Sequence, residues 1–297
     1  MSNLAKRWEP HTKPPPKTAP EPETPLKSIS EIEADYVRLV QETTDSPIDL
    51  GRWLPGFRAC CRPLIPGDLV TILAATAVGK TAILQNIAGS MPDVPTLLFE
   101  LELSGESLFE RFVGQKGNFT GWQVEEAYRK GVRMGQAGLG SMFEKLLVCT
   151  LPGLSVDSLE VISRQATGKL GQPAKLILVD YIQLMTGQGS SRYERFSDIA
   201  EGLRRLAKTL LAAVVVTSQV KRTDGEDPEV SLCDAKESGS IENSSSLVLG
   251  AWREPSIEGG PADKMFIRVL KNTRGTSGRL IECRWSPTMR ITEQASR

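Results

Sequence analysis

Short aliphatic runs alternate with longer amphipathic stretches over most of this chain of 297 residues, beginning at about Leu50. Aliphatic runs of this kind predict strands that are buried on both faces, and the helices between them would cover a parallel sheet on each side. The expected fold is therefore an α/β domain over residues 48–297. The expected strands are Leu69–Ala74, Thr96–Glu100, Leu146–Cys149, Leu176–Asp180 and Ala213–Ser218, and the expected helices are Lys80–Gly89, Ser107–Gly114, Thr120–Gly135, Ser155–Thr167 and Arg192–Leu211.

The pattern changes in the last third of the chain, where the polar stretches between apolar runs become short. In three runs there, apolar and polar residues alternate as they do in strands. These runs are Leu247–Trp252, Lys264–Leu270 and Arg279–Trp285. Their spacing favours hairpins over strand–helix–strand units. We expect antiparallel strands at the C-terminal end of the sheet.

The N-terminal segment has a different composition. Residues 1–27 contain seven prolines and almost no large apolar side chains, which predicts a disordered tail because too little surface can be buried to offset the ordering entropy. The tail is either a flexible leader or a docking segment. Apolar residues over Ser28–Gln41 recur at helical spacing with acidic residues on the first turns, so we expect a short helix capped by Ser28 or Ser30. This helix and a linker would occupy residues 28–47.

Composition narrows the class of protein. Hydrophobic residues make up 40% and charged residues 24%, and the formal net charge is zero, so any nucleic-acid binding would depend on local basic patches. The five cysteines form no CxxC pair, and His11 is the sole histidine. This argues against a zinc site and suits a reducing cytoplasm. No apolar run reaches the ~18 residues that a membrane span needs.

Candidate chemistry begins at the end of the first expected strand. Residues Ala74–Thr81 match the phosphate-loop pattern GxxxxGK[ST], except that alanine replaces the first glycine. Curled backbone N–H groups, a helix N-terminus and one lysine are what a phosphate chain requires. We therefore expect ATP here, with Lys80 on the β- and γ-phosphates and Thr81 on Mg²⁺. The expected phosphate-binding residues are Ala75, Thr76, Ala77, Val78, Gly79, Lys80 and Thr81.

Polar residues at the ends of neighbouring strands complete a hydrolytic site. Asp180 ends an aliphatic strand and would orient Mg²⁺. Glu100 and Glu102 follow another strand, and either could activate water. Gln219 follows the Ala213–Ser218 strand, where it is equally well explained as a γ-phosphate sensor or as a turn residue.

Together these motifs resemble the C-terminal motor domain of DnaB-type replicative helicases, a RecA-like family that forms hexameric rings on single-stranded DNA. The resemblance explains the alanine at position 74, and its order and spacing agree over roughly residues 26–292. It implies a RecA-like P-loop NTPase with a mostly parallel central sheet, C-terminal β-hairpins and a short N-terminal linker helix. The motifs that carry it are Pro66–Leu69, Phe99–Ser104, Leu178–Met185, Thr217–Gln219, Lys236–Glu242 and Lys271–Gly278.

The resemblance also implies roles for individual residues. It selects Glu102 over Glu100 as the catalytic carboxylate, and Gln219 as the sensor that couples hydrolysis to DNA movement. It implies single-stranded DNA as substrate, held by a loop at the ring channel. The residues of that loop are Lys236, Glu237, Ser238 and Gly239.

One motif departs from the family pattern. The family completes its ATP site with an arginine finger from the neighbouring subunit. Lys271 matches the family lysine, but Thr273 stands where the arginine is expected and the arginine is displaced to Arg274. A shift of one residue in a strand reverses the side-chain direction. Arg274 is the residue that the resemblance favours, with Arg279 as a substitute.

The resemblance gives the helix at Ser28–Gln41 a purpose, because the family's linker helix packs on the adjacent motor domain. We expect a compact form of the family without its N-terminal helical domain, which contacts primase. The expected function is an ATP-driven, ring-forming DNA helicase with a primase or loader protein as a partner. Two alternatives stay open: a DNA-stimulated ATPase that loads or remodels other proteins, and a ring subunit that does not unwind DNA.

Overall fold

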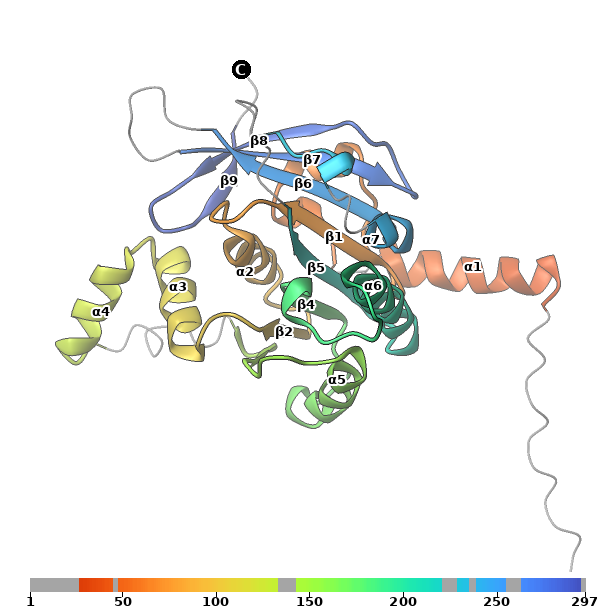
Figure 1. Cartoon of the computed structure of the whole chain (residues 1–297), viewed down its shortest axis with the longest axis horizontal. Helices are drawn as coiled ribbons and strands as arrows, with labels where there is room; N and C mark the ends of the chain where they lie inside the picture. Colours follow the sequence, from red (N-terminus) through yellow and green to blue (C-terminus); the bar gives the residue numbers. More distant parts are fainter. Residues whose placement is uncertain are drawn as a thin grey trace, which may run out of the picture. The chain divides into compact units, whose positions relative to one another are not determined.

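A computed structural model of the protein describes residues 27–44, 48–132, 143–220, 229–234, 239–254 and 263–294. The chain divides into two compact units, residues 1–42 and residues 43–297. The main described element of the first unit is helix α1, Ile29–Thr44. The last residues of this helix lie beyond the boundary at residue 42. The second unit holds the sheet and the remaining helices (Figure 1).

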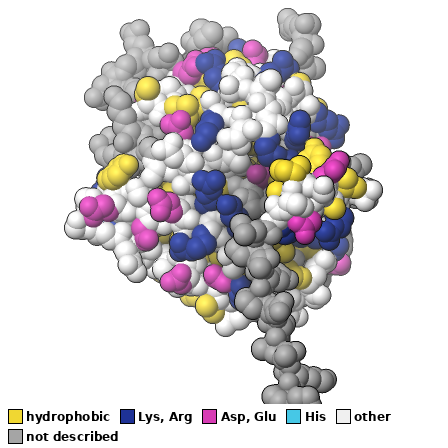
Figure 2. All heavy atoms as spheres, turned by 90° about the vertical axis from the view of Figure 1, so that its right-hand side faces the viewer, with side chains coloured by type: hydrophobic (Ala, Val, Ile, Leu, Met, Phe, Trp, Pro, Cys, Tyr) yellow, Lys and Arg dark blue, Asp and Glu magenta, His cyan; other side chains and the backbone are white. Residues whose placement is uncertain are grey.

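Helix α1 begins at a reciprocal cap. The Glu31 backbone N–H lies 3.3 Å from the Ser28 hydroxyl, and the Glu31 carboxylate accepts from the Ser28 backbone N–H at 2.7 Å. This arrangement satisfies N–H groups that have no partner within the first turn, and it confirms the expected helix with Ser28 as its cap. Ile29, Tyr36 and Val37 are 80%, 57% and 48% exposed, and Figure 2 shows hydrophobic side chains on the surface of this helix.

The described residues of the second unit form one nine-stranded sheet in the order β3-β2-β4-β5-β1-β6-β7-β8-β9. In this spatial order, all neighbouring strands from β3 to β6 are parallel. The remaining neighbours, β6 with β7, β7 with β8 and β8 with β9, are antiparallel. The parallel sheet and the C-terminal antiparallel strands are therefore confirmed. The bounds are β1 Leu69–Ala74, β2 Thr96–Glu100, β3 Leu146–Cys149, β4 Leu176–Asp180, β5 Ala213–Gln219, β6 Leu247–Arg253, β7 Lys264–Asn272, β8 Leu280–Trp285 and β9 Ile291–Glu293.

Helices cover both faces of this sheet (Figure 1). Val70 and Ile72 of β1 pack into one core cluster with the buried face of α2. Leu69 of the same strand points the other way, into a second cluster with α5 and α6. Each face of the sheet thus has its own hydrophobic core, as a sheet buried on both sides requires. The helices are α2 Lys80–Ser90, α3 Gly105–Gly117, α4 Gly121–Arg129, α5 Val156–Leu170, α6 Arg192–Thr209 and α7 Gly239–Ser244, with 3-10 turns η1 Leu50–Arg52, η2 Pro55–Ala59 and η5 Ile182–Leu184.

Two elements differ from the expectation. The helix predicted over Thr120–Gly135 ends at Arg129, since Gly131 has a φ of 81°, outside the helical range. Strand β6 was expected only as part of a hairpin, yet it also pairs in parallel with β1. This second pairing puts the C-terminal strands beside the central strand. No helix in the described ranges is long and apolar enough to cross a membrane.

Candidate active site

The phosphate loop lies at the carboxyl end of the central strand β1, where α2 begins. Ala77 and Gly79 have φ angles of 65° and 113°, so the chain curls tightly before the helix. Gly79 caps α2, and a Cβ atom on it would lie 2.5 Å from the Trp285 ring. The loop therefore requires glycine both for its backbone conformation and for the close approach of Trp285.

Lys80 begins α2 and is only 8% exposed. Its Nζ lies 5.1 Å from the centre of the Tyr181 ring, which follows β4. Burial lowers the pKa of Lys80, while the carboxylates of Asp180 and Glu102 oppose this shift. The ammonium group is thus held where little water reaches it, facing the cavity that the phosphate loop borders.

Thr81 lines this cavity and contacts the buried Asp180. The Thr81 hydroxyl donates to one carboxylate oxygen of Asp180, and the Thr217 hydroxyl donates to the other at 2.6 Å. Asp180 is fully buried. A hydroxyl and a carboxylate side by side are the oxygen donors that Mg²⁺ prefers, usually with several waters kept in its shell. These residues fit a magnesium ion.

The two glutamates that the sequence left as alternatives occupy different surroundings. Glu100 is fully buried, and its Oε1 accepts from the backbone N–H groups of Glu102 at 3.1 Å and Leu103 at 2.9 Å. Its Oε2 is buried with no hydrogen-bond partner among the described residues. Burial, reinforced by the charge of Asp180, raises the pKa of Glu100 to about 7. Glu102 is exposed and lines the cavity.

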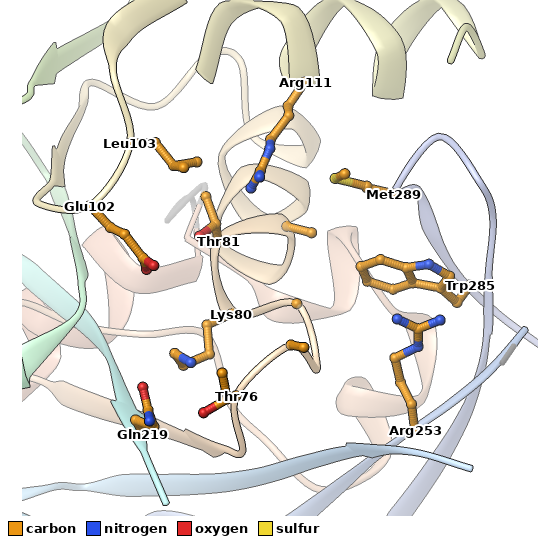
Figure 3. A pocket seen from close by; sticks show the side chains of 13 residues that line it. Thr76, Lys80, Thr81, Glu102, Leu103, Arg111, Gln219, Arg253, Trp285 and Met289 are labelled. Atoms are coloured by element: carbon orange, nitrogen blue, oxygen red, sulfur yellow. The ribbon is translucent and has the colours of Figure 1, made fainter. Parts of the chain in front are cut away.

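The cavity has a volume of ≈ 320 Å³ and is drawn in Figure 3. Thr76, Lys80 and Thr81 approach it from the loop and α2, with Glu102 and Gln219 on the side of the neighbouring strands. Six residues that sequence reasoning did not assign to the site complete the wall: Ala82, Leu103, Arg111, Arg253, Trp285 and Met289.

Arg253 and Trp285 form a stacked pair on the far wall of the cavity. The Arg253 guanidinium lies 4.4 Å from the centre of the Trp285 ring, within the range of a cation–π contact. Burial lowers the pKa of Arg253. Arg253 ends β6 and Trp285 ends β8, so the pairing depends on the order of strands in the sheet. Aromatic residues at strand ends carry no local signal that could have identified them.

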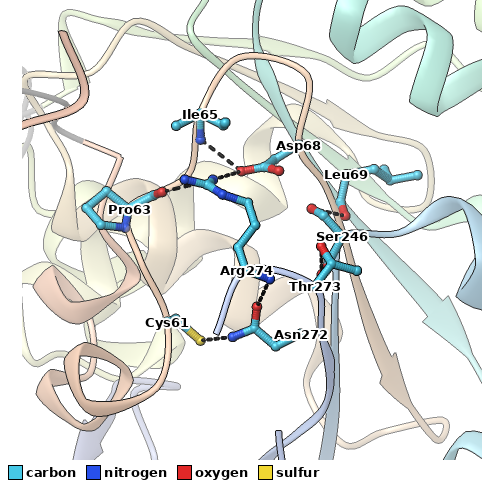
Figure 4. Close-up of polar contacts among 9 residues, drawn as sticks. All are labelled: Cys61, Pro63, Ile65, Asp68, Leu69, Ser246, Asn272, Thr273 and Arg274. Carbon is cyan, nitrogen blue, oxygen red and sulfur yellow. Dashed lines mark hydrogen bonds and ion pairs between the residues drawn. The ribbon is translucent and has the colours of Figure 1, made fainter. Parts of the chain in front are cut away.

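Arg274 is engaged within its own chain (Figure 4). Its guanidinium forms an ion pair with Asp68 at 2.8 Å and donates to the Pro63 carbonyl at 3.4 Å. Arg274 does not line the cavity of its own chain. Thr273, at the position where the family has arginine, donates to the Ser246 carbonyl at 3.1 Å.

The other two basic residues of this motif differ in their contacts. The Lys271 Nζ donates to the Glu242 carbonyl at 2.6 Å, whereas the Arg279 side chain is exposed. Of the expected DNA-binding loop, Lys236, Glu237 and Ser238 lie outside the described residues. Gly239 begins α7.

The chain matches known proteins over most of its length. Residues 56–292 match the model of the family described as "DnaB-like helicase C terminal domain". The replicative DNA helicase DnaC of Bacillus subtilis is 28% identical over 236 residues, 75% of this chain and 49% of that protein. The replicative DNA helicase DnaB of Geobacillus stearothermophilus is 26% identical over 233 residues, with the same coverage. The chain spans about half the length of these curated relatives.

Solved structures agree with the fold. A solved structure described as an ATPase domain superposes with a TM-score of 0.77 at 20% identity, covering 90% of this chain and 99% of that one. A DnaB-like replicative helicase, whose structure was reported with its interactions with primase, gives 0.74 at 19% identity and covers 90% and 67% of the two chains. The RecA-like fold expected from the resemblance is confirmed.

Proposed function

This chain belongs to the DnaB-like helicase C-terminal domain family, and we propose that it is a cytoplasmic ATP-driven helicase motor that assembles into a ring and moves along single-stranded DNA. One observation carries this proposal above the others. Lys80, Thr81, Asp180, Glu102 and Gln219 come from four segments of the chain, yet they converge at the carboxyl ends of adjacent parallel strands. Such an edge is where open α/β sheets bind ligands.

ATP would bind with its phosphates on the loop between β1 and α2. The backbone N–H groups of residues 75–81 and the N-terminus of α2 offer positive potential, and Lys80 adds a full charge. Thr81 and Asp180 would hold Mg²⁺ through their oxygen atoms. When bound, this ion neutralises phosphate charge.

Glu102 would accept a proton from the attacking water. Its carboxylate is exposed to the cavity, whereas Glu100 is buried beneath it with one oxygen bonded to the backbone. Of the two glutamates, Glu102 is the one that borders the cavity in which the γ-phosphate would lie, and this supports the choice made by the resemblance. Gln219 would contact the γ-phosphate. When that phosphate is released, the loss of this contact would move the segments that follow β5.

The nucleobase would lie against the Arg253–Trp285 pair. Both side chains present flat surfaces to the cavity, and flat π-systems stack on a purine with a gain of about 1 kcal/mol. Trp285 also contacts Gly79 of the phosphate loop. The base and the phosphates would therefore be bound by residues that lie against one another.

The cation supplied to a neighbouring ATP site would come from the β7–β8 segment. Arg274 is held by Asp68 and Pro63 of its own chain, and this contact favours Arg279, which is exposed on the same segment, as the trans residue. DNA would be gripped by residues 236–239 from several subunits, and a primase or loader protein would be an additional partner. The trans cation, the DNA-binding loop and the partner protein are proposed because the chain belongs to this family.

The test is hydrolysis and unwinding by the purified chain. We expect ATPase activity that rises with single-stranded DNA, unwinding of a forked duplex, and a closed or spiral hexamer around oligo-dT in electron micrographs with an ATP analogue. Lys80→Ala should abolish the first two and leave the assembly intact. An ATPase that unwinds no fork under any loading condition would contradict the helicase function.

A second function is favoured by the departure at Thr273 and by the ion pair of Arg274. If no cation completes the neighbouring site, the chain would be a ring subunit that binds nucleotide without unwinding. Such a subunit would form rings with ATP analogue, and Lys80→Ala would leave its biological role unchanged.

A further inference from the structure

The β4–β5 pairing ends before Gln219, the last residue of β5, is reached. Backbone pairing between the strands stops at Val179 and Val216, while β5 continues to Gln219. In a parallel strand, successive residues direct their backbone groups to alternate neighbours. Val214 and Val220 donate toward β1, so the N–H and C=O groups of Gln219 face the side where β4 has already ended.

The side chain of Gln183 occupies that side. It belongs to η5, the turn that follows β4. Its Oε1 accepts from the Gln219 backbone N–H at 3.1 Å, and its Nε2 donates to the Gln219 carbonyl at 2.9 Å. The same Nε2 donates to the Ser218 hydroxyl at 3.1 Å. The amide of Gln183 thus pairs with Gln219 as the backbone of a strand would.

We propose that Gln183 is a positioning residue that holds Gln219 in the nucleotide cavity by replacing the missing strand pairing. Both donors and the acceptor of its amide are used, and this complete pairing fixes the amide orientation. A side chain that senses a phosphate needs supporting hydrogen bonds to hold it in place, and Gln183 supplies them to the backbone of Gln219. This inference deepens the proposed function and rests on it for the role of Gln219.

The pairing also links two parts of the site. Asp180 ends β4 only three positions before Gln183, and its carboxylate accepts from Thr217 on β5. Two successive contacts, Asp180 with Thr217 and Gln183 with Gln219, therefore join the metal side of the site to the sensor side. Movement of the turn after β4 would be transmitted to Gln219 through a two-point contact.

The kinetic test uses Gln183→Met, which keeps the length of the side chain and removes all three hydrogen bonds. We expect kcat for ATP to fall roughly 10-fold to 100-fold, the range for a misplaced catalytic group, with KM nearly unchanged. Gln183→Glu should behave in the same way, because a carboxylate has no donor for the Gln219 carbonyl. Gln188→Met, an exposed position five residues further on, is the matched control and should retain wild-type kcat.

A double-mutant cycle with Gln219→Ala separates positioning from general stability. If Gln183 acts through Gln219, Gln183→Met should lower kcat no further once the Gln219 side chain is gone. An equal loss in both backgrounds would overturn the proposal, and so would wild-type kcat in Gln183→Met.

Hydrogen exchange tests the contact without reference to catalysis. The Gln219 amide should exchange at least ~10-fold faster in Gln183→Met than in the wild-type chain, because its hydrogen bond has been removed. An unchanged exchange rate would refute the positioning role. If the wild-type chain hydrolyses no ATP while this amide is deprotected as expected, the proposed function fails and the structural contact stands.

Discussion

Replacing Glu100 by glutamine should make the protein more stable at neutral and alkaline pH. Glu100 is fully buried next to Asp180, and its Oε2 has no hydrogen-bond partner in the described part of the chain. Ionising it there places a second negative charge against Asp180 without a counterion. Glutamine keeps the Oε1 acceptor for the backbone N–H groups of Glu102 and Leu103 and removes the charge.

The size of the effect follows from the pKa of Glu100, which burial and Asp180 raise from 4.5 to about 7. Below pH 4.5 the carboxyl group is protonated in both the folded and the unfolded chain and costs nothing. Between pH 4.5 and 7 the unfolded chain ionises first, so the free energy of unfolding falls. Above pH 7 the loss is complete and amounts to about 3 kcal/mol.

The assay is chemical and thermal unfolding of wild type and Glu100→Gln from pH 4.5 to 8, in buffer without Mg²⁺ or nucleotide. At pH 8 the variant should unfold roughly 5–10 °C higher, given the usual conversion for a domain of this size. The difference should shrink steadily toward pH 4.5. Glu201→Gln, an exposed position on α6, is the control and should show no such trend. A constant difference across the pH range, or none at pH 8, would refute the reasoning.

Four further outcomes are expected. Lys80→Ala should reduce kcat for ATP at least ~100-fold without lowering the melting temperature, since the buried ammonium is already destabilised; a markedly lower melting temperature would count against this. Trp285→Ala should raise KM for ATP about 3- to 10-fold, the equivalent of about 1 kcal/mol of stacking, and an unchanged KM would exclude a base contact. Arg274→Ala should lower the free energy of unfolding by about 2 kcal/mol because it leaves the buried Asp68 without its ion pair. In rings mixed with wild-type subunits, Arg279→Ala should lower hydrolysis and Arg274→Ala should not, and the reverse result would restore Arg274 as the trans residue.

The elements that the sequence predicted well are those with a local cause. Short aliphatic runs such as Leu176–Asp180 favour buried strands, and a lysine and threonine after a glycine at a helix start have few other uses. The helix expected to reach Gly135 was too long because a helical pattern continues past Gly131, where the backbone leaves the helix. Trp285 and Met289, which the structure adds to the cavity wall, lie 206 and 210 positions after Gly79 of the phosphate loop. Their proximity depends on strand order, which no local pattern contains.

Glu100 and Glu102 show a second reason why a local sequence pattern is insufficient. Glu100 and Glu102 are two residues apart, so strand alternation alone would direct both to one face. The strand ends at Glu100, however, and the turn that its own carboxylate stabilises carries Glu102 out into the cavity. The different surroundings of the two glutamates therefore arise because the first glutamate bonds the backbone of the second.

The charges around the cavity give a physical reason for the ligands proposed here. Asp180 and Glu102 lie near the buried Lys80 and oppose the loss of its charge. Arg111 and Arg253 add two further cations to the cavity wall. These three cations would attract a triphosphate, whereas the carboxylates of Glu102 and Asp180 would repel its oxygen atoms. A divalent cation offsets the carboxylates and the phosphates at once, so the cavity should favour nucleotide that arrives with its metal.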